Sequence, residues 1–179
     1  MNIKFGSNLL LSVFVCALGI FGLGEAAVPI DGGVTDKTNH HAPKTIISKE
    51  ITEFNVHAFI FNESKEGEGS VYTFTVKKEG SVLMASESHS GSRSPADEKL
   101  LRKLQNVIDK YELVKRNGTY HVTAGLPAEF QPCNFETVYA SGEVLRFTID
   151  SEPDAEWAKE IYLVFATWFA QKGNGGLVL

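Results

Sequence analysis

The sequence predicts a two-layer α+β domain, in which an antiparallel sheet of five or six strands carries two amphipathic helices on one face. Two observations predict this class. Segments rich in β-branched and aromatic residues follow one another through short turns, as in an antiparallel meander. Two other segments, 94–113 and 151–171, carry apolar residues at helical spacing, and such helices need a sheet face to bury them.

Residues 1–26 predict an export signal. Lys4 gives a positive start, residues 9–23 form an apolar run, and small residues at Gly24 and Ala26 favour cleavage near Ala26. The mature protein is then expected to be secreted or periplasmic and to meet a membrane only transiently during export. A retained membrane anchor is one alternative, although the run is short and broken by glycine. Lipid attachment at Cys16 is another, but Cys16 lacks the small preceding residue that this modification needs.

Residues 27–49 predict a flexible leader, because they are rich in proline, glycine and polar residues and show no sustained period. His40 and His41 are adjacent but have no further ligands beside them, so we expect a solvated linker and no bound metal. A single α+β domain is expected over residues 50–172, followed by a C-terminal tail over residues 173–179.

The composition narrows the class of partner. Hydrophobic residues make up 43% of the chain and charged residues 22%, which are ordinary values for a globular protein. The formal net charge of −5 disfavours nucleic acid as a partner, because an acidic protein repels phosphates at long range. With Cys16 in the signal, Cys133 is the one cysteine of the mature protein, so no internal disulfide is expected.

Three strands are expected to open the domain. Imperfect alternation over residues 51–60 predicts the first strand, and aromatic and β-branched residues over 70–77 predict the second. A polar connection over 62–69 joins them. A turn at 78–80 then leads to a third strand over 81–86, which completes a meander.

A long helix follows, and its start is marked by Ser94 as N-cap, Pro95 in the first turn and Asp97 three residues after the cap. It is expected to end near Leu113. Its outer face is basic. A sheet-covering helix needs a charged outer face in any case, although such segregated charge would also suit an acidic partner or a membrane surface. The basic residues of this region are Arg93, Lys99, Arg102, Lys103, Lys110, Lys115 and Arg116.

The remaining elements again place strands before a helix. A turn at Asn117-Gly118 precedes a short strand over 119–124, and a hairpin over 135–149 turns at residues 141–143. The last helix is expected to start at Ser151 or Pro153 and to run to about residue 171, with its broad apolar surface on the sheet.

The loop over residues 86–93 is the predicted ligand site. A Gly/Ser loop that enters a helix can bind an anion through its backbone amides, and an arginine can add a bidentate contact. The acidic first turn of the helix opposes this interpretation, and an ordinary mobile connection is the alternative. The candidate ligand-binding residues are His89, Ser90, Ser92 and Arg93.

Motifs for catalysis, cofactors and metals are weak. Cys133 and His121 form the one thiol–imidazole combination, with no third group to orient the histidine and no helix start to activate the thiol. The sequence has no HExxH, paired CxxC, Gly-rich phosphate loop or GxSxG motif. We therefore expect no catalytic residue, no cofactor and no metal. Sequons at Asn62 and Asn117 are possible glycosylation sites in a suitable host.

Several short motifs resemble small exported bacterial domains of unknown function. They are Tyr111-Glu112-Leu113, Asn117-Gly118, Gly125-Leu126-Pro127 and the hairpin of residues 138–147. The resemblance covers residues 50–170 in outline. It implies a place in the bacterial envelope and carries over no catalytic residue.

These observations favour an exported, non-enzymatic binding or interaction domain whose partner is a protein or a small anionic ligand. One alternative is an envelope hydrolase with a site assembled near loop 86–93 from His89, Arg93, His121 and Cys133. Another is a structural subunit of a surface assembly. Convergence of at least two of those side chains in a pocket, with perturbed pKa values, would favour the enzyme, whereas an apolar patch, for example at residues 177–179, or an open sheet edge would favour binding.

Overall fold

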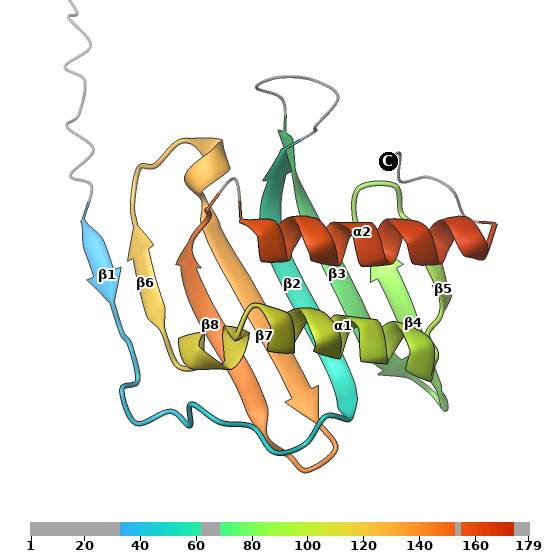
Figure 1. Ribbon diagram of the computed structural model, residues 1–179. Helices are drawn as coiled ribbons and strands as arrows, with labels where there is room; N and C mark the ends of the chain where they lie inside the picture. The colour runs from blue at the N-terminus through green and yellow to red at the C-terminus, as the bar shows by residue number, and fades with distance from the viewer. Residues whose placement is uncertain (1–32, 62–68, 153–154, 174–179) are drawn as a thin grey trace, which may run out of the picture.

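A computed structural model describes residues 33–61, 69–152 and 155–173 and shows one eight-stranded sheet with two helices. Both helices lie over the same face of the sheet (Figure 1). The predicted α+β class is confirmed. The predicted antiparallel sheet of five or six strands is wrong in number and in type, because the sheet has eight strands and is mixed.

The strands lie in the order β1-β6-β8-β7-β2-β3-β4-β5, and every neighbouring pair is antiparallel except β6 and β8, which are parallel. The short edge strands escape prediction because three residues cannot display an alternation. Their bounds are β1 Val34–Asp36, β2 Ile51–Phe61, β3 Gly69–Glu79, β4 Val82–Glu87, β5 Arg93–Pro95, β6 Tyr120–Thr123, β7 Pro132–Tyr139 and β8 Val144–Asp150.

The parallel pair results from a long crossover. After β5 the chain passes over the sheet as helix α1 (Glu98–Lys110) and the 3-10 turn η1 (Leu113–Arg116), and it returns at the opposite side as β6. The next strands form the hairpin β7–β8 after a second 3-10 turn, η2 (Ala128–Phe130). This hairpin places β8 between β7 and β6, so β8 meets β6 in the parallel direction.

Helix α1 begins three residues later than predicted. Asp97 is the N-cap, and its carboxylate accepts hydrogen bonds from the amides of Lys99 at 2.9 Å and Leu100 at 3.1 Å. The expected cap, Ser94, is instead a buried residue of β5 that pairs with Ala85. The β4–β5 pairing thus holds Ser94 extended and moves the helix start to the next residue with a suitable side chain.

Helix α2 (Glu156–Gln171) packs an aromatic surface on the sheet. The ring of Phe165 stacks on Phe74 of β3 with centroids 4.7 Å apart and lies 6.1 Å from Phe54 of β2. At the other end, Trp157 meets Phe147 edge to face at 6.0 Å. These contacts join the C-terminal helix to the central strands and form the middle of the core.

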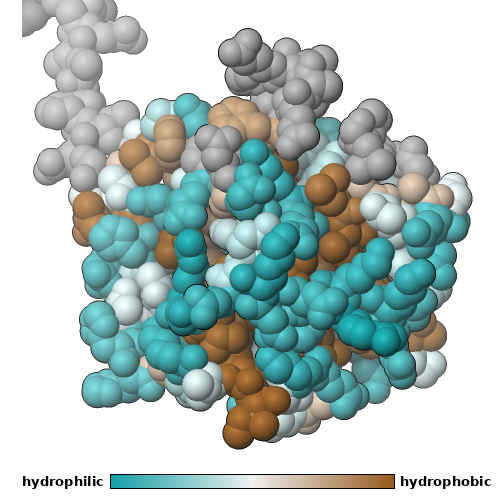
Figure 2. Space-filling model, viewed as in Figure 1, coloured by the Kyte–Doolittle hydropathy of each residue, from teal (hydrophilic) through white to brown (hydrophobic). Residues whose placement is uncertain are grey.

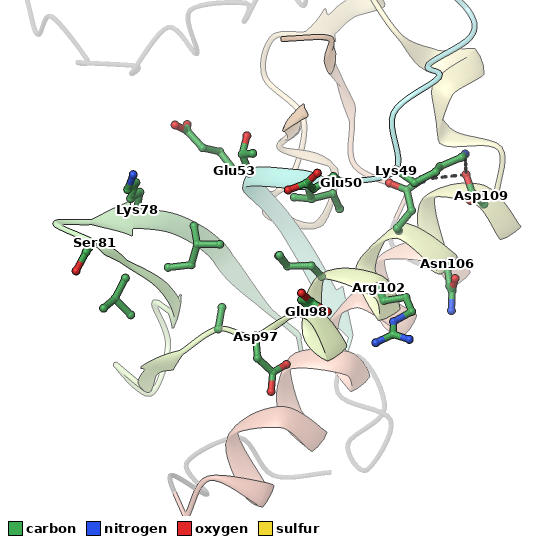
Figure 3. A pocket seen from close by; sticks show the side chains of 17 residues that line it. Lys49, Glu50, Glu53, Lys78, Ser81, Asp97, Glu98, Arg102, Asn106 and Asp109 are labelled. Carbon is green, nitrogen blue, oxygen red and sulfur yellow. Dashed lines mark hydrogen bonds and ion pairs between the residues drawn. The ribbon is translucent and has the colours of Figure 1, made fainter. Parts of the chain in front are cut away.

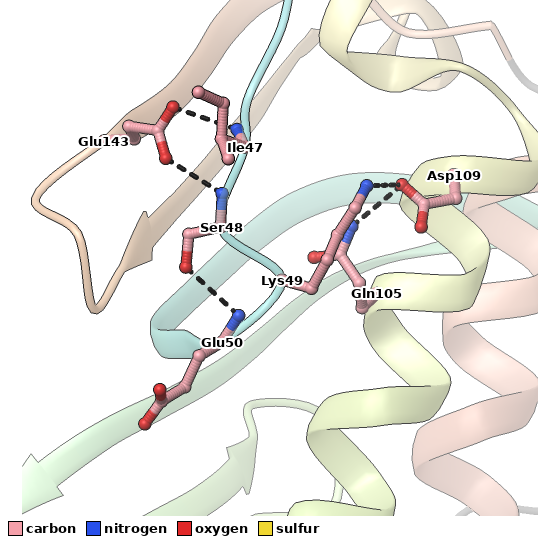
Figure 4. A network of polar contacts seen from close by, with 7 residues as sticks. All are labelled: Ile47, Ser48, Lys49, Glu50, Gln105, Asp109 and Glu143. Carbon is pink, nitrogen blue, oxygen red and sulfur yellow. Dashed lines mark hydrogen bonds and ion pairs between the residues drawn. The ribbon is translucent and has the colours of Figure 1, made fainter.

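The structure describes part of the segment that was predicted to be a flexible leader, from residue 33 onward. We call residues 33–49 the N-terminal arm. The arm contributes β1, which pairs with β6, and then runs along one end of the sheet (Figure 1). The carboxylate of Glu143 accepts hydrogen bonds from the amides of Ile47 and Ser48, both at 3.0 Å (Figure 4), and these hydrogen bonds lower the pKa of Glu143. The arm therefore belongs to the folded structure.

Asn117 joins the arm to the sheet. Its side-chain amide donates to the carbonyl oxygens of Pro43 at 2.9 Å and Val144 at 3.2 Å, while its Oδ1 accepts from the amide of Arg146 at 2.9 Å. Asn117 is only 4% exposed. The second sequon thus lies on a buried structural asparagine, whereas Asn62 lies outside the described residues.

The face of the sheet away from the helices is polar. His57 Nδ1 lies 2.9 Å from Thr73 Oγ1, and Thr148 donates to Asn134 at 2.9 Å across neighbouring strands. An antiparallel sheet with one solvated face shows this alternation. The helix side is also largely hydrophilic in the view of Figure 2, with separate hydrophobic patches between the polar side chains.

Candidate functional site

The predicted ligand loop lies between β4 and β5, and the backbone amides of His89 and Ser90 form hydrogen bonds within the chain. The buried carboxylate of Glu87 accepts hydrogen bonds from the Ser90 amide at 2.9 Å, from the Ser90 hydroxyl at 2.6 Å and from the His89 amide. Arg93 forms an ion pair with Glu79 at 2.5 Å, and the Ser92 hydroxyl lies 2.7 Å from that of Ser90. The carboxylate of Glu87 thus binds two of the loop amides that could otherwise face an anion.

The four candidate side chains of the enzyme alternative are not brought together. His121 lies on β6 and His89 follows β4, and five strand spacings, about 24 Å, separate these strands. Cys133 is on β7, with Ile149 of β8 between it and His121 in the register. Burial raises the pKa of Cys133 to about 12, so the group is a thiol at neutral pH and a poor nucleophile.

The described residues contain neither a metal-ligating cluster nor a membrane-spanning helix. Among residues 33–61, 69–152 and 155–173, no group of three or more metal-ligating side chains gathers, and His40 and His41 are part of no such group. In the same ranges no helix is long and apolar enough to cross a membrane. Residues 1–26, which are predicted to be an export signal, and residues 177–179 lie outside the described residues.

Part of the basic surface of α1 is neutralised by partners within the chain. Lys110 lies 2.5 Å from Glu160 of α2, and Arg116 lies 3.0 Å from Glu152. Arg102 instead lines a groove on the side of the helix that faces β2 and the β3–β4 hairpin. We call this cavity of about 990 Å³ the α1 groove (Figure 3).

Three segments line the α1 groove. They are the arm end with the start of β2, the β3–β4 hairpin, and α1 with the residues that precede it. On the helix, the lining residues recur at the spacing of one helical face. The lining consists of Lys49, Glu50, Ile51, Thr52, Glu53, Lys78, Ser81, Val82, Leu83, Ala96, Asp97, Glu98, Leu101, Arg102, Gln105, Asn106 and Asp109.

The α1 groove lies where β2 and β3 separate. Pairing between these strands ends at Phe54 and Val76, while β3 continues to Glu79 beside β4. A β-bulge at Thr52 shifts the register of β2 against β7 at the same level, and bulges bend a strand. Figure 3 shows the β3–β4 hairpin, which carries Lys78, leading away from β2. The separation opens the inner surface of the sheet beside α1.

The separation also leaves a strand edge open. The Ser88 amide donates to the Thr73 carbonyl, so the odd-numbered residues of β3 direct their main-chain groups toward β4. Because this direction alternates along a strand, the N–H and C=O of Lys78 point to the β2 side. No residue of β2 in the described chain is paired with Lys78. Its main-chain donor and acceptor therefore face the groove.

The groove has an apolar floor under a charged rim. Ile51 is buried, and Leu83 and Leu101 are partly buried against the same core. Around them the lining carries five carboxylates against three basic side chains. Figure 3 shows Glu50 and Glu53 at the β2 side, with Glu98 at the start of α1.

Two of the five carboxylates already have partners. Asp97 caps α1, and Asp109 accepts hydrogen bonds from Lys49 at 2.6 Å and from Gln105 at 2.9 Å (Figure 4). Within the described ranges, Glu50, Glu53 and Glu98 form no ion pair. These three side chains are exposed, whereas Gln105 is only 5% exposed. The groove thus presents unused acceptors above an apolar floor.

Sequence reasoning missed this site, although one signal was present. Glu98, Leu101, Gln105 and Asp109 share a helix face that mixes acids with an apolar and an amide side chain. That stripe differs from both the buried face and the basic face of α1. The bulge at Thr52 and the end of the β2–β3 pairing had no comparable signal.

No protein-family model matches this chain, and the searches of curated proteins and of solved structures also found no match. A proposal about function therefore depends on the geometry of the α1 groove and on the sequence pattern.

Proposed function

We propose that this chain is an exported, non-enzymatic binding domain and that its ligand site is the α1 groove. The observation that carries the proposal is the separation of β2 from β3, which exposes an apolar floor and an unpaired strand edge in one cavity. Ligand sites are concave and combine apolar surface with polar groups that fix orientation, and the groove combines an apolar floor with a charged rim. The pattern of residues 1–26 supports export.

The non-enzymatic part of the proposal has separate support. The candidate nucleophile Cys133 is a buried thiol, and the candidate base His121 lies far from loop 86–93. The titratable side chains that line the α1 groove are carboxylates, lysines and one arginine, most of them on its exposed rim. This set of exposed charges suits recognition of a charged partner.

Methyl NMR of the exported chain tests the location of the site. We expect a mixed pool of short peptides to shift the methyl signals of Leu83 and Leu101, because both side chains line the groove floor. The matched controls are Leu163, which is 48% exposed on α2, and Val144, which is 39% exposed at the start of β8. Neither control lines the groove, so their signals should not move.

Two results would count against the α1 groove. Shifts confined to Leu163, Val144 or other positions outside the lining would place binding elsewhere on the molecule. A pool that shifts no methyl signal at concentrations up to about 1 mM, the weak limit of specific recognition, would exclude peptide binding by this groove.

A further inference from the structure

We infer that the occupant of the α1 groove is an extended polypeptide segment that carries lysine or arginine beside an aliphatic side chain. This inference rests on the proposed function and names the ligand class of the same site. Two features of the groove support it: an open strand edge and a surplus of carboxylates.

The open strand edge favours an extended polypeptide over a compact ligand. The N–H and C=O of Lys78 face the space that β2 has left, and β3 continues beyond its last pair with β2 at Val76. Peptides that add a strand to such an edge gain affinity from main-chain hydrogen bonds. They place alternate side chains in pockets, and Leu83 and Leu101 provide an apolar surface for one of them.

The rim charges favour a basic segment. Five carboxylates against three cations give the lining an excess of two negative charges. Glu50 and Glu53 are both exposed, form no ion pair in the described chain and lie on the β2 side of the groove, while Glu98 lies on the helix side. A cationic side chain that passes between these two sides would meet carboxylates on both, whereas an acidic segment would be repelled.

The exposed carboxylates of the rim point to the same ligand chemistry, because ionised carboxylates only accept hydrogen bonds. Lysine and arginine side chains carry only donors. The acceptors of the groove and the donors of a basic segment are therefore complementary.

A charge series of peptides tests the inference. The probes are short blocked peptides of one sequence that contains leucine and valine and carries lysine, glutamine or glutamate at the same two positions. Affinity for the full chain is measured by calorimetry, with Leu83 and Leu101 methyl shifts to confirm the place of binding. We expect the lysine peptide to bind about tenfold more tightly than the glutamine peptide, and the glutamate peptide to bind least. A lysine peptide with N-methylated backbone amides should lose most of its affinity, because it cannot pair as a strand.

Matched variants of the protein separate charge from folding. The double variant E50Q/E53Q changes two exposed side chains and should weaken the lysine peptide about fivefold, with little change for the glutamine peptide. The control E129Q/E156Q removes two carboxylates outside the groove lining and should change neither affinity. Raising the salt concentration from about 0.05 M to about 0.5 M should reduce the difference between the lysine and glutamine peptides.

The outcomes distinguish this inference from the proposed function. Tighter binding of the glutamine or glutamate peptide, still with shifts at Leu83 and Leu101, would overturn the basic ligand and keep the groove as a binding site. Unchanged affinity of the N-methylated peptide would overturn the strand-like mode. An absence of shifts at both leucines with every peptide would overturn the proposed function as well.

Discussion

Replacing Phe165 with alanine is expected to lower the free energy of unfolding by about 4 kcal/mol. The Phe165 ring is fully buried and lies between the rings of Phe74 at 4.7 Å, Phe54 at 6.1 Å and Phe169 at 6.1 Å. Truncation removes buried apolar surface and leaves a cavity that the surrounding strands cannot fill, since each neighbouring ring is held by other contacts. Chemical denaturation followed by circular dichroism measures the loss.

The matched control for this prediction is Leu163→Ala. Leu163 lies two residues away on α2 but is 48% exposed, so its truncation should change the free energy of unfolding by less than about 0.5 kcal/mol. An effect of Phe165→Ala below about 1 kcal/mol, or equal effects of the two substitutions, would contradict the packing of α2 on the central strands.

Replacing Asn117 with alanine is expected to lower the free energy of unfolding by about 3 kcal/mol, the second large effect. The substitution removes the partner from three part-buried hydrogen bonds, which involve the carbonyl oxygens of Pro43 and Val144 and the amide of Arg146. Two of the partners belong to β8 and one to the N-terminal arm. The variant should therefore lose stability and also show faster amide exchange in the arm, which denaturation and hydrogen exchange measure separately.

The control for Asn117 is another asparagine, Asn134. It is exposed on the polar face of the sheet and accepts one hydrogen bond, from Thr148 at 2.9 Å. Asn134→Ala should lower the free energy of unfolding by less than about 1 kcal/mol, as is usual for an exposed polar contact. Glycosylation of Asn117 in the folded protein would contradict the account, because its side-chain nitrogen is buried and occupied.

The elements that the sequence predicted well are those with a strong local pattern. Strands β2, β3 and β4 follow the expected order, and the aromatic face of the last helix was evident from residues such as Trp157 and Phe165. Long periodic segments determine their own structure because the burial of one face dominates over other preferences. The class α+β follows from these segments.

The features that the sequence did not predict depend on distant partners. Ser94 is a good N-cap by residue type, but its pairing with Ala85 makes it a strand residue, and Asp97 is the N-cap instead. The three residues of β1 have no pattern of their own and are a strand only because β6 lies beside them. The parallel contact of β6 and β8 likewise follows from the route of the chain over the sheet.

The candidate site escaped prediction for the same reason. The predicted loop around Ser90 has the residue types of an anion site, but the carboxylate of Glu87, three residues earlier, uses its amides. The α1 groove results from the end of a strand pairing at Val76 and from a bulge at Thr52, and neither leaves a mark in the local sequence. The mixed face of α1 that lines the groove could be recognised in the sequence. A helix face alone does not indicate a cavity, because the strands form its other side.

Amide hydrogen exchange at Lys78 tests the central claim most directly. The Lys78 amide points to the open side of β3, whereas the Lys77 amide points to β4 and serves as an internal reference. In the isolated protein we expect Lys78 to exchange much faster than Lys77. With a saturating lysine-containing peptide, exchange at Lys78 should slow by at least about tenfold while exchange at Lys77 changes little. Protection of the Lys78 amide in the isolated protein, or no slowing on peptide binding, would contradict the account of the α1 groove as a site for an added strand.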